Sequence, residues 1–152
     1  PGGGPAPGPA PIAFRVGAEG IDYGKDMTTD AAGNLYVAGY FSGTIDADPG
    51  PGVATLASAG NVDVVLAKYD RAGRFLWVRR WGGPAAEIPH AVDVAPDGAI
   101  LMAGYFGGTV DFGGRTLTSA GGRDVWVARY DPTGALVWVS GFGSAADDEA
   151  MD

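Results

Sequence analysis

An internal repeat covers most of this chain and constrains its fold more than any local motif does. Residues 33–46 return as residues 98–111 with 8 of 14 positions identical, and residues 55–78 return as residues 116–139 with 13 of 24 identical. Repetition at this period is typical of a fold built as an array of one structural unit. The sequence therefore says much about architecture and little about chemistry.

The two copies differ in length at one place, where their offset falls from 65 to 61 residues. The first copy reads Asp46-Ala-Asp-Pro-Gly-Pro-Gly52 there, and the second reads only Asp111-Phe-Gly-Gly-Arg115. Length varies in loops and is kept in packed elements. This junction is therefore predicted to be a loop, enlarged in the first copy.

Each copy contains four short β-like runs separated by turn signals. The runs are residues 26–30, 34–41, 63–69 and 74–81 in the first copy, and 91–95, 99–106, 124–130 and 135–142 in the second. Runs one and two, and runs three and four, are joined by tight turns that contain Gly and begin with Asp or Pro. We expect a four-stranded antiparallel meander with one long connection between runs two and three.

The apolar pattern within the runs indicates sheets that are covered on both faces. Leu35-Tyr-Val-Ala38, Val64-Val-Leu-Ala67 and Val125-Trp-Val-Ala128 are nearly continuous, without the alternation of a sheet with one wet face. No stretch is typical of a helix of ten or more residues, so neighbouring sheets must supply the cover. Radially stacked four-stranded sheets meet this requirement, and the predicted fold class is an all-β protein built of β-propeller blades.

The order of these motifs resembles a known family. Residues 30–39 read Asp-x-x-Gly-Asn-Leu-Tyr-Val-x-Gly, and Gly-Thr-Ile-Asp, Asp-Val-Val-Leu-Ala-Lys-Tyr-Asp and Gly-x-x-x-Trp follow at 43–46, 63–70 and 73–77. This arrangement resembles the bacterial SBBP repeat over about residues 12 to 152, although Ala99-Ile-Leu-Met102 departs from it in the second copy. The resemblance implies a seven-bladed β-propeller in a secreted or cell-surface bacterial protein. It implies no catalytic residues.

The repeat also predicts how the chain is divided. Residues 1–11 form a Pro/Gly-rich disordered leader, 12–17 an orphan outer strand, 18–83 a first blade, 84–143 a second blade, and 144–152 the start of a further blade. Propellers contain about 4–8 blades, so two blades do not close a ring. We expect a piece of a larger propeller that needs further blades in the same chain or self-association to close.

Composition excludes several functions. A net charge of −8 argues against nucleic-acid binding, which needs a basic surface. No apolar run approaches the roughly 18 residues of a membrane-spanning helix. The chain has no Cys, which excludes disulfides and thiolate metal sites.

Acidic residues suggest a metal site at one end of the blades. In propellers the connections between strands two and three, and between blades, lie on the same end, called the top here. Asp22, Asp26, Glu87, Asp147 and Asp148 fall in or near the interblade connections, with Glu19 and Glu149, and predict an anionic top rim. In the other connection Asp46, Asp48 and Asp111 offer oxygen ligands for Ca²⁺. The favoured alternative is a Pro-Gly turn without a metal.

Aromatic residues suggest a second kind of site at the top. Tyr40, Phe41, Tyr105 and Phe106 end the second strands, where they either line a binding groove or pack between blades, and packing is favoured. The paired aromatics Trp77 and Trp138, and Tyr69 and Tyr130, are interpreted as core. His90, the one imidazole of the chain, is expected to be solvated at the entry to a strand, and Asp63 and Asp124 to cap backbone N–H groups.

These observations favour a non-enzymatic β-propeller scaffold that binds a protein or glycan partner through its top loops and contains no cofactor. Two alternatives remain. One is a Ca²⁺-dependent propeller hydrolase or lyase, which would need carboxylates converging from several blades. The other is carbohydrate binding by the aromatic residues of the top loops.

Overall fold

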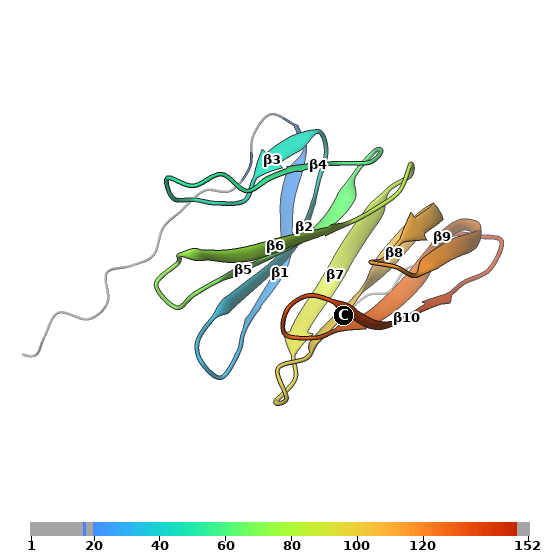
Figure 1. Ribbon diagram of the computed structural model, residues 1–152. Helices are drawn as coiled ribbons and strands as arrows, with labels where there is room; N and C mark the ends of the chain where they lie inside the picture. The colour runs from blue at the N-terminus through green and yellow to red at the C-terminus, as the bar shows by residue number, and fades with distance from the viewer. Residues whose placement is uncertain (1–16, 18–19, 149–152) are drawn as a thin grey trace, which may run out of the picture.

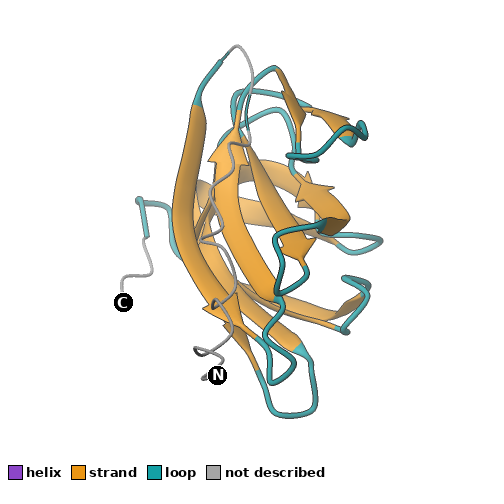
Figure 2. Cartoon of the chain, turned by 90° about the vertical axis from the view of Figure 1, so that its left-hand side faces the viewer, coloured by secondary structure: helices purple, strands orange, loops and turns teal. Residues whose placement is uncertain are grey.

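The computed structural model describes residues 17 and 20–148, and these form only strands and loops (Figure 2). Among them no helix is long and apolar enough to cross a membrane. The predicted leader at 1–11 lies outside the described residues, as do most of the orphan strand at 12–17 and the end of the segment at 144–152. The strands are β1 (Asp22–Thr29), β2 (Leu35–Phe41), β3 (Thr44–Asp46), β4 (Thr55–Ala57), β5 (Asp63–Tyr69), β6 (Phe75–Trp81), β7 (Glu87–Val94), β8 (Ile100–Asp111), β9 (Thr116–Tyr130) and β10 (Leu136–Phe142).

The strands form two four-stranded antiparallel sheets that follow the repeat. The first sheet has the order β1-β2-β5-β6 and the second the order β7-β8-β9-β10. The all-β class and the four-stranded meander are confirmed. β1 and β7 begin four residues earlier than expected, at Asp22 and Glu87, because each strand continues its pairing to the end of its neighbour, opposite Phe41 and Phe106.

The predicted tight turns are confirmed at the end of the sheets opposite the top. Gly33, Gly73, Gly98 and Gly134 all have φ between 77° and 82°, a left-handed conformation that glycine adopts without steric cost. In the first turn Asp30 Oδ1 accepts hydrogen bonds from the amides of Ala32 and Asn34 at 3.0 and 2.9 Å. Asp70 and Asp131 make the same pair of bonds in their own turns.

The connection between the second and third strands is a β-hairpin, which the sequence analysis did not anticipate. In the first copy β3 pairs with β4, from Asp46 opposite Thr55 to Thr44 opposite Ala57. In the second copy β8 and β9 continue past the sheet and form the same hairpin, with Asp111 opposite Thr116. The copies differ in length only at the hairpin tip, so the predicted loop is confirmed there. β3 and β4 each alternate between more and less exposed residues over only three positions. Such a short alternation does not identify a strand from sequence.

The two sheets pack face to face and share one hydrophobic core (Figure 1). β7 packs against β1, β2 and β5, so the inner strand of the second sheet lies across the first. Directly paired residues point to the same face of a sheet, which lets the pairing define two faces. The forward face of the first sheet, which meets the second, carries Tyr36, Ala38, Val64, Leu66, Trp77 and Trp81. The rear face of the second sheet meets it with Ile100, Met102, Phe106, Trp126, Ala128 and Tyr130.

Trp81 is the principal aromatic contact between the sheets. It is 4% exposed, and its ring lies 4.3 Å from that of Tyr130, which is fully buried. Trp77 packs edge-on against Tyr36 with ring centres 6.0 Å apart. Its counterpart Trp138 is 39% exposed. The interpretation as core therefore holds for Tyr69, Tyr130 and Trp77, whereas Trp138 lies on a face that no sheet of the described residues covers.

Two buried carboxylates lie where β6 leads into β7. Asp63 and Glu87 are both fully buried. Asp63 Oδ2 accepts hydrogen bonds from the Ala59 amide at 2.9 Å and from the Arg80 guanidinium. Glu87 Oε2 accepts one from the Gly83 amide at 2.8 Å, while its Oε1 has no partner among the described residues. Asp124 accepts the amide of Ala120 at 2.8 Å as Asp63 accepts that of Ala59, so the predicted capping role is confirmed in both copies.

The pKa of Glu87 is raised from 4.5 to about 7, mainly by burial and also by the charge of Asp63, against the opposing effects of the Gly83 amide and Arg80. A carboxyl group whose pKa is higher in the folded state binds its proton more tightly there than in the unfolded chain. Its contribution to stability is therefore complete below the unfolded pKa and is lost as the pH rises toward 7.

Replacing Trp81 by Ala should lower the free energy of unfolding by about 3–5 kcal/mol, because a large ring is removed from a closed junction. The change should be read from urea unfolding at equilibrium. The matched control is Trp138→Ala in the second sheet, where the ring is exposed, with an expected loss below about 1 kcal/mol. Equal losses in the two variants would contradict the assignment of Trp81 to the junction.

Replacing Glu87 by Gln should remove a pH-dependent loss of stability. Between pH 4.5 and pH 8 the wild-type chain should lose about 3 kcal/mol relative to the variant, since the two pKa values differ by about 2.5 units. The measurement is urea unfolding of both proteins across this range. A difference between them that stays constant with pH would show that Glu87 keeps an ordinary pKa.

Candidate binding surface

The top end of the sheets is where β2 leads to β5 and β6 leads to β7. The strand register places these connections together, because Phe41 at the end of β2 lies opposite both Asp22 and Asp63, and Trp81 lies opposite Val64. The tight turns capped by aspartate occupy the other end. The top therefore gathers the variable hairpins and the first residues of β1 and β7.

A patch of aromatic side chains lies near this end, and we call Tyr23, Tyr40, His90, Tyr105 and Arg123 the tyrosine patch. The rings of Tyr23 and Tyr40 stack with centres 5.2 Å apart and an angle of 18°. Those of His90 and Tyr105 are 5.3 Å apart, and the guanidinium of Arg123 lies 4.7 Å from the centre of the Tyr105 ring. Tyr23 is 58% exposed, and the other four are half-buried.

The members of the patch come from both sheets and influence one another. Burial raises the pKa of Tyr40, and the hydroxyls of Tyr23 and Tyr105 raise it further. Arg123 also forms an ion pair with Asp147 at 3.0 Å, which holds the cation beside the Tyr105 ring. The patch combines aromatic faces, phenol hydroxyls and a cation, a set that suits polar and aromatic ligands.

The structure separates the four aromatic residues that the sequence analysis grouped. Tyr40 and Tyr105 belong to the tyrosine patch. Phe41 and Phe106 are each 1% exposed, so they pack inside the protein, and Phe41 also contributes to the wall of a cavity on the rear face of the first sheet. They point to the rear faces of their sheets, and Phe106 contacts Phe112 with ring centres 5.9 Å apart.

The predicted metal ligands Asp46, Asp48 and Asp111 instead accept hydrogen bonds from backbone amides of their own hairpins. Asp46 Oδ1 accepts hydrogen bonds from the amides of Asp48 and Ala54 at 3.1 and 2.8 Å, and these bonds lower the pKa of Asp46. Asp48 accepts the amide of Gly50, and Asp111 those of the two glycines that follow it. Within residues 17 and 20–148, no group of three or more carboxylates or imidazoles is placed to hold a metal ion.

The predicted anionic top rim is only partly confirmed, because several of its carboxylates are buried or paired. Asp26 lies within β1, and its Oδ2 accepts the amide of Val92 at 2.8 Å, so it connects the two sheets. Glu87 is buried, and Asp147 is paired with Arg123. Glu19 and Glu149 lie outside the described residues. With Arg123 in the patch, the top carries both signs of charge.

His90 lies at the irregularity in β7 between Pro89 and Ala91, where the register with β8 shifts. Its side chain is half-buried against Tyr105, and its Nε2 is buried without a hydrogen-bond partner among the described residues. The expectation of a solvated histidine is therefore wrong. Sequence reasoning also missed Tyr23 and Arg123, whose only signal was their proximity to strand ends at the top.

Comparison with known proteins supports the repeat. Residues 15–43 match the β-propeller repeat family SBBP. The chain is 30% identical over 154 residues to the regulatory protein FlaEY of Caulobacter vibrioides, an alignment that covers 97% of this chain and 16% of the relative. It is 23% identical over 108 residues to an uncharacterised WD repeat-containing protein of Acanthamoeba polyphaga mimivirus, covering 62% of this chain and 8% of the relative.

The chain thus spans less than a fifth of the length of either relative. The WD repeat is itself a propeller unit of four strands, in agreement with the two four-stranded sheets described above. The family match begins before β1 and ends just after β2, within the first sheet. This chain carries the SBBP β-propeller repeat.

Proposed function

We propose that this chain is a non-enzymatic β-propeller module that binds a protein partner through the tyrosine patch. The observation that carries the proposal is the stacked, partly exposed pair Tyr23 and Tyr40 beside the Arg123–Tyr105 pair. Tyrosine and arginine are enriched at the energetic centres of protein interfaces, because both combine a large contact area with directional hydrogen bonds. The patch contains residues of both sheets. Packing of the sheets alone does not require partly exposed tyrosines at this end.

Other observations support a binding role over catalysis. His90 is the one imidazole of the chain, and its ring is packed on Tyr105 instead of beside a nucleophile. The carboxylates of the hairpin tips are occupied by backbone amides. The names of the relatives, a regulatory protein and a WD repeat-containing protein, agree with an interaction scaffold.

We further propose a secreted or cell-surface location. The support is the resemblance to a repeat that occurs largely in surface or secreted bacterial proteins. Further blades, from the same chain or from another copy, would complete the ring in which the patch is presented.

Selection of a displayed peptide library on the wild-type chain tests the protein-binding role. Most recovered peptides should lose at least about tenfold in affinity for the double variant Tyr40→Ala, Tyr105→Ala, because each loses an aromatic contact of roughly 1–2 kcal/mol. Affinities should be measured by biolayer interferometry, with Trp138→Ala as the control for loss of an exposed ring outside the patch. Peptides that bind the double variant as well as the wild type would contradict the proposal.

A carbohydrate ligand is the second candidate, favoured by the exposed face of Tyr23, on which a sugar ring can stack. This carbohydrate role is tested on a glycan array, which is probed with the wild-type chain and with the variants Tyr40→Ala and Tyr105→Ala. Binding that both substitutions abolish would establish the carbohydrate role. A blank array would remove it and leave the protein-binding proposal in place.

A further inference from the structure

The chemistry of the tyrosine patch indicates which kind of protein segment it can bind, and this inference rests on the proposed function. Tyr23 and Tyr40 hold their rings at an angle of only 18°, and Tyr23 is 58% exposed. Among the described residues, the hydroxyls of Tyr23, Tyr40 and Tyr105 make no hydrogen bond with a protein group. The patch therefore offers flat ring faces and hydroxyl donors to a ligand.

The stacked pair stays accessible although a neighbouring sheet is in place. Tyr23 lies opposite Tyr40, and Tyr40 lies opposite Val64, so both tyrosines belong to the forward face that the second sheet meets. Val64 is fully buried in that junction, yet Tyr40 is only half-buried and Tyr23 is more than half exposed. These two rings therefore form a surface of the joined sheets and do not arise from an uncovered face.

Addition of a peptide as a further strand does not suit this surface. Strand addition needs a regular free edge with its N–H and C=O groups in sequence. The inner strands of both sheets are irregular beside the patch, since their pairing shifts between Gly24 and Asp26 in β1 and between Pro89 and Ala91 in β7. Pro89 also has no N–H to donate.

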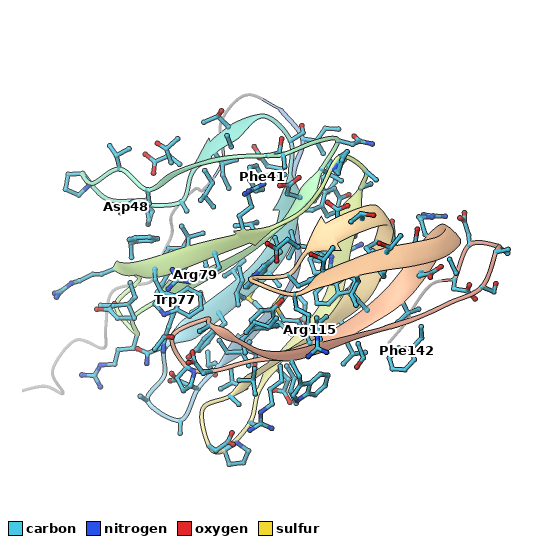
Figure 3. The ribbon with its side chains drawn as sticks, turned by 45° about the vertical axis from the view of Figure 1, so that its right-hand side comes forward. Phe41, Asp48, Trp77, Arg79, Arg115 and Phe142 are labelled. Carbon is cyan, nitrogen blue, oxygen red and sulfur yellow. The ribbon has the colours of Figure 1, made fainter. Side chains whose placement is uncertain are left out.

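A helical or strongly charged peptide suits the patch no better. An amphipathic helix needs an apolar groove, but Phe41, the large apolar neighbour of Tyr40, is 1% exposed and lies under the β3–β4 hairpin (Figure 3). The guanidinium of Arg123 lies 4.7 Å from the centre of the Tyr105 ring, where a ligand cation would otherwise bind. Asp147 is paired with that guanidinium, so the patch has no cluster of cations for an acidic ligand.

A segment in the polyproline II conformation matches the groups that the patch offers. Such a segment has no internal hydrogen bonds, so its carbonyl groups face outward as acceptors, and its prolines have no N–H groups that need partners. Its pyrrolidine rings are compact and apolar and can pack on aromatic faces. Because the conformation is formed before binding, little conformational entropy is lost, which is how aromatic surfaces of other domains bind proline-rich segments.

We propose that the tyrosine patch binds a proline-rich segment of the protein partner in the polyproline II conformation. Proline rings of the ligand pack on the exposed face of Tyr23, and its carbonyl groups accept hydrogen bonds from the hydroxyls of Tyr40 and Tyr105. Residues 5–11 of this chain themselves read Pro-Ala-Pro-Gly-Pro-Ala-Pro. This segment is a possible competitor for the patch, so it is included in the test.

Fluorescence anisotropy with a labelled polyproline peptide of about ten residues tests the proposal on the full chain. Tyr23→Ala should weaken binding at least about tenfold, because it removes the exposed ring face. Tyr40→Phe and Tyr105→Phe keep their rings and should each weaken binding about fivefold through loss of one hydrogen bond. The control Trp138→Ala removes a partly exposed ring outside the patch and should bind like the wild type. A Gly-Ser peptide of equal length should not bind.

Circular dichroism and thermal unfolding establish that each variant is folded. A wild-type chain that does not bind the peptide at about 1 mM would overturn the proposal, and so would equal affinities of the wild type and the three tyrosine variants. Binding that appears only after deletion of residues 1–11 would assign the patch to that segment instead of to a partner, and would also overturn it.

Failure of this inference is distinguishable from failure of the proposed function. Library peptides that need Tyr40 and Tyr105 but contain no proline-rich sequence would overturn the assignment to polyproline II and leave the binding role of the patch in place. Library peptides that bind the double variant as well as the wild type would contradict both.

Discussion

The packing of the forward face of the first sheet on the rear face of the second is the interaction on which the rest of this structure depends. A four-stranded sheet with apolar residues on both faces has no stable state in water by itself, because one face or both would stay hydrated. The junction solves this for one face of each sheet. It buries the stacked rings of Trp81 and Tyr130, and it includes the hydrogen bond that Asp26 of β1 accepts from the Val92 amide of β7.

The same junction explains why the carboxylates of Asp63 and Glu87 are buried. Asp63 holds the start of β5 to the hairpin before it and is paired with Arg80. Glu87 holds the connection into β7 through the amide of Gly83. Burying a charged group is costly unless its bonds are made, and for Glu87 the protonated form reduces this cost. The connection between blades is therefore the part of the structure whose charge state is coupled to folding.

The features that the sequence predicted well are those in which local signals agree with the tertiary arrangement. The strands repeat in the two copies, and the glycines of the tight turns stand at positions that require positive φ. Asp63 and Asp124 were identified as caps because a side-chain acceptor suits the start of a strand, whatever packs against it later. The hairpin of β3 and β4 escaped detection because three alternating residues occur often by chance.

The candidate site was less predictable, because burial there is decided by the neighbouring blade. Tyr40 and Phe41 are adjacent in sequence, yet one reaches the top surface and the other the core, since successive side chains of a strand point to opposite faces. Glu87 was expected in the rim because it falls in the connection between blades, yet it is fully buried, as acidic residues rarely are. Trp138 has the sequence signature of a core residue but lies on a face that no sheet in the described part of the chain covers.

The positions where the two copies diverge make the two ends of the molecule unequal. The rear face of the second sheet fills its junction with Trp126 and Met102, and the equivalent face of the first sheet has Val65 and Val37 and remains hollow. Tyr23 and Tyr40 of the tyrosine patch also line this cavity, so the hollow face of the first sheet adjoins the patch. Substitutions at the diverged positions Val37 and Val65 therefore change the cavity wall beside Tyr23 and Tyr40, which allows one blade architecture to present different surfaces to different partners.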